Sequence, residues 1–572
     1  MEAIDANPAW RCRACGAAPP SGTGEEGSAA HRYCPVCSTP ECDDDALDRL
    51  QSQHQDAKRL YGNRLVSPTP EVVAFMAGWD VAGKGAADQN LVPFDLWVNR
   101  AHAHTLVRCT ILTPEQGRAI LDGLAEIERL YRLGQFVVQP ALEDVHTNIE
   151  TYLSGNLGIE AALSLHTARS RNDQVVTDMR LWMRERVLNL ARLTLDCIDA
   201  LCAVARQHLN SVMAGYTHHQ HATLSTFGHH LAAYAEALRR VVQRLNFWYE
   251  TFNYSPLGCV TGFSTTFAID RHLTAELLGF HGPEPNSLDP IASRWEPEAE
   301  LAQILAVLLA HLSSMAQTLI LLSTPEFGVL KLHPRFCSGS SIMPQKVNPD
   351  ALEVIKAKAA EVTSRLGALL SLGQANLTGY NRDHQWSKYL IMEACLEALP
   401  AVSVMTRVIR HSCRPLATNP WLDRPVGIDT ARLHAMARSG FTGVTEFMEQ
   451  LVALRGVEFR RLKGVMEHAV ALSLQQGESD CVTPAAMRQA LHAEGLDLDV
   501  DAETVNRLQE PAAILKSKHV MGGPGPEAME AELAQLDSFA ASQRHVWQER
   551  LEKLQACDDR CRQFDVGRIS ET

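Results

Sequence analysis

The sequence predicts a mainly α-helical protein of several domains, built on a central bundle of long helices and preceded by a small zinc-binding module. Residues 175–210 contain no glycine or proline, and their apolar residues recur at helical spacing. Residues 301–322 are almost wholly apolar, and residues 351–372 are helix-forming apart from one glycine. The first of these helices would be about 50 Å long at 1.5 Å per residue, a length typical of helix bundles.

Length and composition limit the class of protein. A chain of 572 residues predicts two to four domains, and 46% hydrophobic residues suffice for a large core. The net charge of −14 argues against a nucleic-acid-binding protein. Residues 1–9 are polar, so no secretory signal is expected, and the 15 scattered cysteines favour a reducing cytoplasm over a disulfide framework.

The apolar segment 301–322 is long enough to cross a bilayer. It nevertheless carries six polar side chains and no flanking basic cluster; these are Gln303, His311, Ser313, Ser314, Gln317 and Thr318. A helix buried in a subunit interface is therefore favoured over a membrane span.

Two Cys-x2-Cys pairs lie near the N-terminus, formed by Cys12, Cys15, Cys34 and Cys37. Paired thiolates at this spacing are typical of a structural Zn²⁺ site with four sulfur ligands, which predicts a zinc ribbon over residues 1–45. The alternative is a disordered tail, because residues 17–30 are rich in Gly, Ala, Ser and Pro. The ribbon would serve docking to a protein partner or stability, and residues 46–64 would form a linker.

Residues 338–350 read Ser-Gly-Ser-Ser-Ile-Met-Pro-Gln-Lys-Val-Asn-Pro-Asp and run straight into the predicted helix 351–372. Asn348 suits the helix N-cap and Pro349 the first helical position. Polar groups at a helix N-terminus favour an anion. Gly339 and Pro344 would allow the loop to move and then to adopt a fixed conformation. The alternative is a capped helix after a polar turn, without a site.

This loop, followed by Glu353, resembles the signature of the fumarase/aspartase superfamily, whose members eliminate fumarate from a succinyl group. Three further blocks resemble its argininosuccinate lyase branch, at residues 165–174, 215–221 and 380–388. The resemblance covers residues 70–540 and implies a three-domain lyase with domains at 65–165, 166–420 and 421–540, followed by a charged helix and tail at 541–572. It also implies a homotetramer in which three subunits build each site.

The resemblance implies anti elimination across a C–N bond, releasing fumarate and an amine from an N-succinyl substrate. The proton removed lies beside a carboxylate, so the enzyme must stabilise developing negative charge. By resemblance, Ser340 is the base and Lys346 stabilises that charge, while His218, paired with Glu353, handles protons. No cofactor is expected for this step.

Further residues are implied as substrate contacts. Ser170, Arg171, Asn172 and Thr217 would hold the fumarate half, and Gln345 and Asn348 of the loop would contribute. Tyr380, Gln385 and Lys388 would hold the polar end of the amine, since a neutral amide and a cation suit an amino-acid leaving group.

The chain departs from the branch at several positions. Asn99 stands where the family usually has a serine that helps hold the leaving amine, so the resemblance implies Asn99 as a further substrate contact. His219 and His221 replace other residues, and residues 259–264 are bulkier than the glycine-rich family stretch. These changes keep open a sister lyase acting on a different N-succinyl substrate. Fumarate hydration or aspartate deamination, and a non-catalytic crystallin-like or zinc-ribbon scaffold protein, are the remaining alternatives. Retention of Ser340, Lys346 and His218 argues for catalysis.

Overall fold

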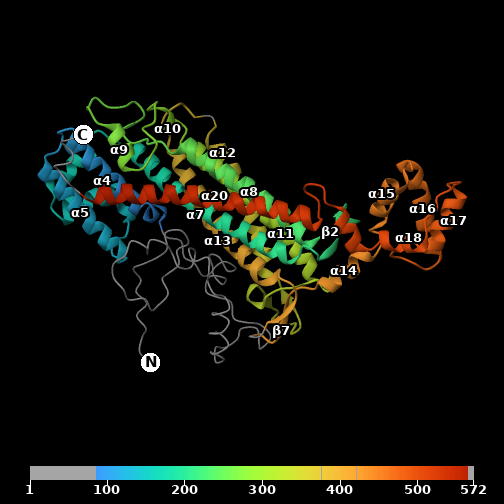
Figure 1. Ribbon diagram of the computed structural model, residues 1–572. Helices are drawn as coiled ribbons and strands as arrows, with labels where there is room; N and C mark the ends of the chain where they lie inside the picture. Colours follow the sequence, from blue (N-terminus) through green and yellow to red (C-terminus); the bar gives the residue numbers. More distant parts are fainter. Residues whose placement is uncertain (1–85, 375, 420–421, 564–572) are drawn as a thin grey trace.

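The computed structural model describes residues 86–374, 376–419 and 422–563, and these form a mainly helical, elongated molecule, as predicted (Figure 1). The predicted zinc ligands lie outside the described residues. The N-terminal part contains η4 (Ala87–Asn90), α4 (Val92–Arg108), α5 (Pro114–Arg132), η5 (Pro140–Leu142), α6 (Val145–Thr151), η6 (Tyr152–Asn156) and η7 (Glu160–His166). Thr113 caps α5 in a reciprocal capping box with Gln116, ahead of Pro114, which fixes this helix start.

The bundle consists of α7 (Arg171–Gln207), α8 (Phe227–Phe252), α11 (Trp295–Ser323), α12 (Asp350–Leu372), α13 (Gln385–Ser412) and α20 (Pro526–Arg562). The α7 helix confirms the predicted long helix. By length and composition alone, α11 and the helix that includes α13 could cross a membrane. In the structure α11 packs against α8, α12 and α13, as the core helix of a soluble bundle does.

Short strands join these helices. β1 (Val212–Thr217) and β2 (Gln220–Thr226) form an antiparallel hairpin. β4 (Ser338–Gly339) pairs with β5 (Val347–Asn348), and a three-stranded sheet has the order β3–β7–β6. The bounds of that sheet are β3 (Leu330–Lys331), β6 (Ala417–Asn419) and β7 (Arg424–Ile428), and η8 (Pro334–Phe336) and η9 (Arg382–His384) are single turns.

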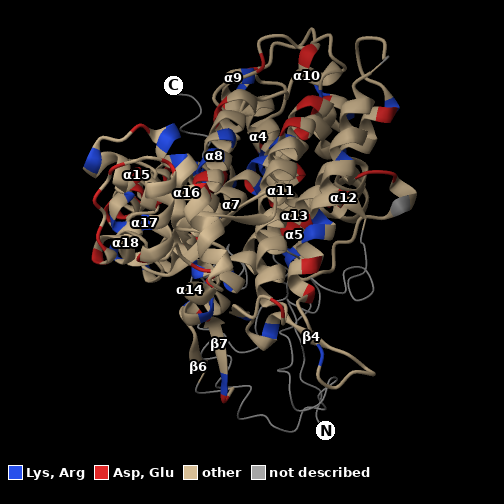
Figure 2. Ribbon diagram, turned by 90° about the vertical axis from the view of Figure 1, so that its right-hand side faces the viewer, with Lys and Arg blue, Asp and Glu red and all other residues tan. Residues whose placement is uncertain are grey.

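The bundle has two ends with different contents. α7, α11 and α13 start at one end, where a side chain on Gly373 at the end of α12 would lie 2.2 Å from the Trp295 ring. This end also holds α9 (Arg271–Leu277) and α10 (Asp289–Ala292), and we call it the α10 end. At the other end, which we call the hairpin end, His208 after α7 bonds to the Cys413 carbonyl after α13. Figure 2 shows α9 and α10 at the top and β4, β6 and β7 at the bottom.

The C-terminal part forms a second core. Helices α15 (Val444–Arg455), α16 (Phe459–Gln475), α17 (Pro484–Ala493) and α18 (Ala502–Leu508) bury their own apolar cluster, at one tip of the molecule in Figure 1. α14 (Thr430–Arg438) and α19 (Pro511–Ser517) lie against the β1–β2 hairpin. α20 then runs back along α7 and α8, so the boundary predicted at 540 falls inside one continuous helix.

Candidate functional site

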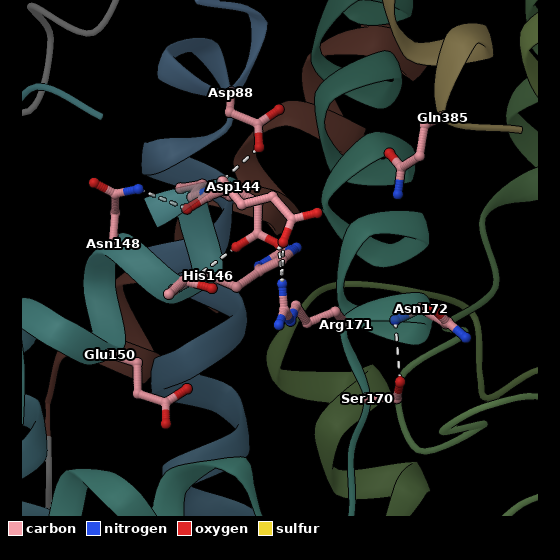
Figure 3. Close-up of polar contacts among 12 residues, drawn as sticks. Asp88, Asp144, His146, Asn148, Glu150, Ser170, Arg171, Asn172 and Gln385 are labelled. Atoms are coloured by element: carbon pink, nitrogen blue, oxygen red, sulfur yellow. Dashed lines mark hydrogen bonds and ion pairs between the residues drawn. The ribbon is translucent and has the colours of Figure 1, made fainter. Parts of the chain in front are cut away.

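The Ser170–Arg171–Asn172 block starts α7 at the α10 end. The Ser170 hydroxyl accepts a hydrogen bond from the Asn172 backbone N–H at 3.3 Å, and the Asp173 carboxylate accepts one from the Ser170 N–H at 2.8 Å (Figure 3). This capping box fixes the position of the hydroxyl at the positive end of a 37-residue helix. Ser170 and Asn172 are half-buried, so both remain accessible to a carboxylate.

Arg171 is held by two carboxylates of its own chain. Its guanidinium lies 3.1 Å from a Glu143 oxygen and 3.0 Å from an Asp144 oxygen, and Arg382 lies 2.8 Å from the other Glu143 oxygen. Hydrogen bonds from Arg382 and Arg171 lower the pKa of Glu143. Through Glu143, the structure brings the block at 170–172 next to the block at 380–388, which sequence spacing alone did not show.

The start of α13 carries the three residues predicted for the amine. The Gln385 amide donates to the Tyr380 hydroxyl at 2.9 Å. Lys388 is buried and forms an ion pair with Asp88 of η4, whose second oxygen accepts from the Val145 N–H at 3.1 Å. These contacts place Lys388 at the contact between η4, α6 and α13, where its charge is already paired.

Behind this surface lies a buried polar cluster of Asp95, His146, Asp178 and Asn99. His146 Nδ1 is 2.9 Å from one Asp95 oxygen and 3.7 Å from an Asp178 oxygen. The Asn99 amide donates to the other Asp95 oxygen at 2.9 Å, and Asn99 is only 2% exposed. The departure at position 99 therefore completes a hydrogen bond within α4.

Charge in this cluster is shared among its members. Burial opposes the charged form of His146, but Asp95 outweighs it and raises the pKa of the imidazole. Burial, together with the Asp95 charge, raises the pKa of Asp178 well above its usual value. The ligand atoms of Asp95, His146 and Asp178 lie within 4.8 Å of one another, close enough for a metal ion. The His146–Asp95 hydrogen bond satisfies one atom of each of these two residues, whereas neither buried oxygen of Asp178 has a hydrogen-bond partner among the described residues.

At the hairpin end, His218 and His219 form the two-residue turn between β1 and β2. Their φ angles are 53° and 60°, a left-handed conformation usually taken by Gly or Asn in such turns. Both imidazoles are exposed, and so is Thr217. His221, by contrast, lies 3.2 Å from the Tyr216 hydroxyl and 3.2 Å from the Ser439 carbonyl, so it tethers the hairpin. Backbone strain of this kind persists where surroundings or function require it.

The signature loop projects between β4 and β5. The Ser340 hydroxyl accepts hydrogen bonds from the Ile342 and Met343 N–H groups, at 3.3 and 3.0 Å. Gln345 and Lys346 are exposed on the same loop. The loop thus presents a serine, with two backbone donors on its oxygen, and a lysine at the start of α12.

The predicted helix cap at Asn348 is wrong. Pro349 occupies the N-cap position, and α12 begins at Asp350. Asn348 instead belongs to β5, where its amide donates to the Ser338 hydroxyl and the Gly339 carbonyl, each at 3.4 Å. The side chain therefore ties the base of the loop, because strand pairing has taken the residue out of the helix start.

The predicted residues fall into two groups that one chain does not bring together. Ser170 and Thr217 are separated by α7, which is about 55 Å long at 1.5 Å per residue. Glu353 is exposed in the first turn of α12, and among the described residues no hydrogen bond or ion pair joins it to His218. Ser170, Asn172 and Lys388 therefore lie at the α10 end of the chain, and the proposed base Ser340 lies at its hairpin end.

Sequence reasoning missed the residues that support this site. Asp88 had no signal in the sequence, because it lies within the short turn η4 and its partner Lys388 is 300 residues away. Asp173 was within the recognised block, and its position three residues after Ser170 is that of a capping-box acid.

Comparison with known proteins identifies the family of this chain. A family model described as "Lyase" matches residues 84–364. The chain is 36% identical to an argininosuccinate lyase of Hahella chejuensis, over 83% of this chain and 95% of the relative. It is 34% identical to one from Methanothermobacter thermautotrophicus, over 80% and 94%.

Among solved structures, a variant of EDDS lyase with bound fumarate is similar with a TM-score of 0.76 and 25% identity, covering 88% of this chain and 97% of that one. The sequence similarity extends over almost the whole length of these relatives, and the solved structure shares the fold. Both findings indicate the same family as the site blocks. The chain therefore belongs to the argininosuccinate lyase branch of the fumarase/aspartase superfamily and is a carbon–nitrogen lyase.

Proposed function

We propose that this enzyme eliminates fumarate from an N-succinyl amine and releases the free amine. The observation that carries the proposal is the loop between β4 and β5, which presents half-buried Ser340 and exposed Lys346 in front of α12. Curated relatives at 34% and 36% identity are argininosuccinate lyases, and a similar structure, an EDDS lyase variant, contains fumarate.

Ser340 is the proposed base of this reaction. A free serine hydroxyl is far too weakly acidic for the task, so its alkoxide needs nearby positive charge. The N–H groups of Ile342 and Met343 already point at the oxygen, and Lys346 supplies a cation on the same loop. Closure of the loop over the substrate would exclude water and strengthen these interactions.

The remaining groups divide between substrate and proton handling. Ser170 and Asn172, at the start of α7, suit one substrate carboxylate, with Thr217 and Asn348 as further contacts. Tyr380, Gln385 and Lys388 suit the polar end of the amine. His218 is proposed for proton transfer on the face opposite Ser340, and Glu353 of α12 is the proposed partner that orients it.

We infer that copies of the chain pack so that the α10 end of one meets the hairpin end of another, in a homotetramer. The two halves of the site are separated by about 55 Å within one chain. Subunit mixing tests this. Ser340→Ala and Asn172→Ala should each be nearly inactive, and reassembly of the two together should restore part of the activity.

A matched control for the mixing experiment uses two changes in the same loop. Ser340→Ala mixed with Lys346→Met should stay inactive, because no chain then carries an intact loop. Recovery in this control, or its absence in the first mixture, would contradict the shared site.

The leaving amine is tested by following fumarate release through its ultraviolet absorbance across a panel of N-succinyl amines that includes argininosuccinate. Release from argininosuccinate would assign the activity of the curated relatives. Release from another N-succinyl amine alone would assign a sister lyase, which the altered residues 259–264 favour. Absence of fumarate with every substrate would contradict the proposed elimination.

We also infer one structural Zn²⁺ per chain, held by Cys12, Cys15, Cys34 and Cys37. The spacing of the two cysteine pairs supports this inference. Metal analysis of a Cys12→Ser/Cys34→Ser protein should show the loss of zinc, whereas elimination by a chain lacking residues 1–60 should persist. Unchanged zinc content would contradict the site. Reduced thiolates of this kind, and scattered cysteines elsewhere, support a cytoplasmic location.

A further inference from the structure

The loop between α8 and α9 adopts an unusual backbone. Four alternate residues, Gly258, Val260, Gly262 and Ser264, have φ angles of 87°, 59°, 105° and 63°. This left-handed conformation is easy for glycine and unfavourable for other residues, most of all for a β-branched one. The chain has glycine at only two of the four positions, so Val260 and Ser264 are held there against their preference.

The strain is maintained by contacts that fix the loop from beneath. One Asp173 oxygen accepts hydrogen bonds from the Gly258 and Val260 N–H groups, both at 2.8 Å. The Cys259 carbonyl accepts from the N–H groups of Gly262 and Ser264, at 2.9 and 3.1 Å. A side chain on Gly262 would approach Leu288 to 3.1 Å, so the loop has little room to shift. The loop is thus rigid rather than open.

This rigid loop exposes two aromatic side chains. Phe263 is 72% exposed and Phe267 is 50% exposed, although nearby Leu257 and Cys259 are buried. Two large apolar side chains that stay half or more exposed on one fixed loop suggest a surface that contacts a ligand or partner.

The loop lies directly beside the substrate-contact block at the start of α7. The two oxygens of Asp173 bind the Ser170 N–H on one side and the Val260 N–H on the other, each at 2.8 Å. Since one carboxylate joins them, the two backbones are only a few ångströms apart. A molecule held at Ser170 and Asn172 therefore lies next to this loop.

We propose that Phe263 and Phe267 form an apolar wall of the substrate pocket that selects an amine carrying an apolar or aromatic group. The inference rests on the proposed elimination and adds the class of amine. The fumarate half of the substrate offers only carboxylates, and Tyr380, Gln385 and Lys388 provide for the polar end of the amine. The part of the substrate that suits two phenyl rings is an apolar substituent on the amine.

The test compares three substrates whose nitrogen is bonded to C2 of succinate, the bond that elimination breaks: argininosuccinate and the N-(1,2-dicarboxyethyl) derivatives of phenylalanine and of glycine. For the wild-type enzyme, kcat/KM should be about 10–200-fold higher for the phenylalanine than for the glycine derivative, the range that one hydrophobic contact typically gives. Phe263→Ala and Phe267→Ala should each reduce this ratio, because kcat/KM should fall further for the phenylalanine derivative than for the glycine derivative.

Phe459→Ala is the matched control, because this phenylalanine is also exposed, at 46%, but starts α16 in the separate C-terminal core. The ratio should not change in this variant. Sedimentation of each variant shows whether the assembly is intact.

Three outcomes would overturn the proposal. The first is a wild-type enzyme that releases fumarate but shows no preference for the phenylalanine derivative. This result contradicts the apolar wall alone and leaves the elimination supported. The second is an equal loss for all substrates with a changed sedimentation coefficient, which would assign the two rings to contact between copies. The third is absence of fumarate from every substrate, which removes the proposed function and this inference together.

Discussion

Polar residues at the two ends of the bundle lie in different environments, paired at one end and exposed at the other. At the α10 end, Lys388 is buried against Asp88, Arg171 is bound by Glu143 and Asp144, and Asp173 accepts three backbone N–H groups. At the hairpin end, His218 and Lys346 are exposed in turns, and the Ser340 hydroxyl accepts hydrogen bonds from two backbone N–H groups of its own loop. The fold thus fixes Arg171 and Lys388 by ion pairs within each chain, and it leaves His218 and Lys346 exposed.

This difference indicates how the proposed site would work. A binding half that is held by ion pairs and capped helices needs little reorganisation when substrate arrives. A half carried on exposed loops gains its catalytic environment only when a second copy and the substrate cover it, because charge interactions strengthen as water is excluded. Changes at the hairpin end should therefore affect rate, and changes at the α10 end should affect binding and stability together.

The largest expected effect is that of Ser340→Ala on the rate. Removal of a general base typically costs about 10²–10⁴-fold, and the loop is exposed, so little packing is lost. Single-turnover fumarate formation is the measurement, and sedimentation should show an intact assembly.

Ser341→Ala is the internal control for this change. Its hydroxyl is exposed one residue further along the loop, so this variant should be much milder. If Ser341→Ala is the inactive variant, the base lies one residue later than we propose. If both variants keep the wild-type rate, His218 or another group is the base.

The next effect is expected from Lys388→Met at the α10 end. Substrate binding should weaken, raising KM more than it lowers kcat, since the lysine is proposed to hold the remote end of the amine. The free energy of unfolding should also fall, by about 3–5 kcal/mol, because Asp88 is left buried without its partner. Steady-state kinetics and denaturant unfolding measure the two effects.

A second substitution separates the two effects of Lys388→Met. Adding Asp88→Asn should recover part of the stability without restoring KM. Lys463→Met, at an exposed pair with Glu467 on α16, should change neither quantity. An unchanged KM for Lys388→Met on all active substrates would contradict the placement of the amine.

Much of the fold could be predicted from the sequence, because its helices are long and their signals are local. The uninterrupted run after Ser170 predicted α7. The cap at Asn348 was predicted wrongly because strand pairing with Ser338, a tertiary contact, outweighed the local capping preference. The C-terminal boundary was obscured because α20 is charged along its exposed face and packs on α7 and α8 over its whole length.

Site residues could be predicted only where they form a continuous sequence motif. Each block was found from its own residues. The sequence did not show that the blocks lie at opposite ends of one chain. Supporting residues such as Asp88 and Asp178 were missed, because a single buried acid has no sequence pattern. The strained backbone at Val260 was equally hidden, since a valine gives no hint of a left-handed conformation.

The smallest expected effect concerns pH and the buried cluster. Burial and the nearby charges of Asp95 and Asp88 raise the pKa of Asp178 above its usual 3.8, with Arg169 opposing them. The folded chain then binds more protons than the unfolded one, so the free energy of unfolding falls as pH rises through the native pKa. Asp178→Asn removes this contribution and should flatten the decrease of Tm as the pH rises above the usual pKa of 3.8. Since His146, whose raised pKa acts with the same sign above pH 6.5, is retained, the decrease should not vanish. An equal or steeper decrease in the variant would show that Asp178 is ionised in the native protein.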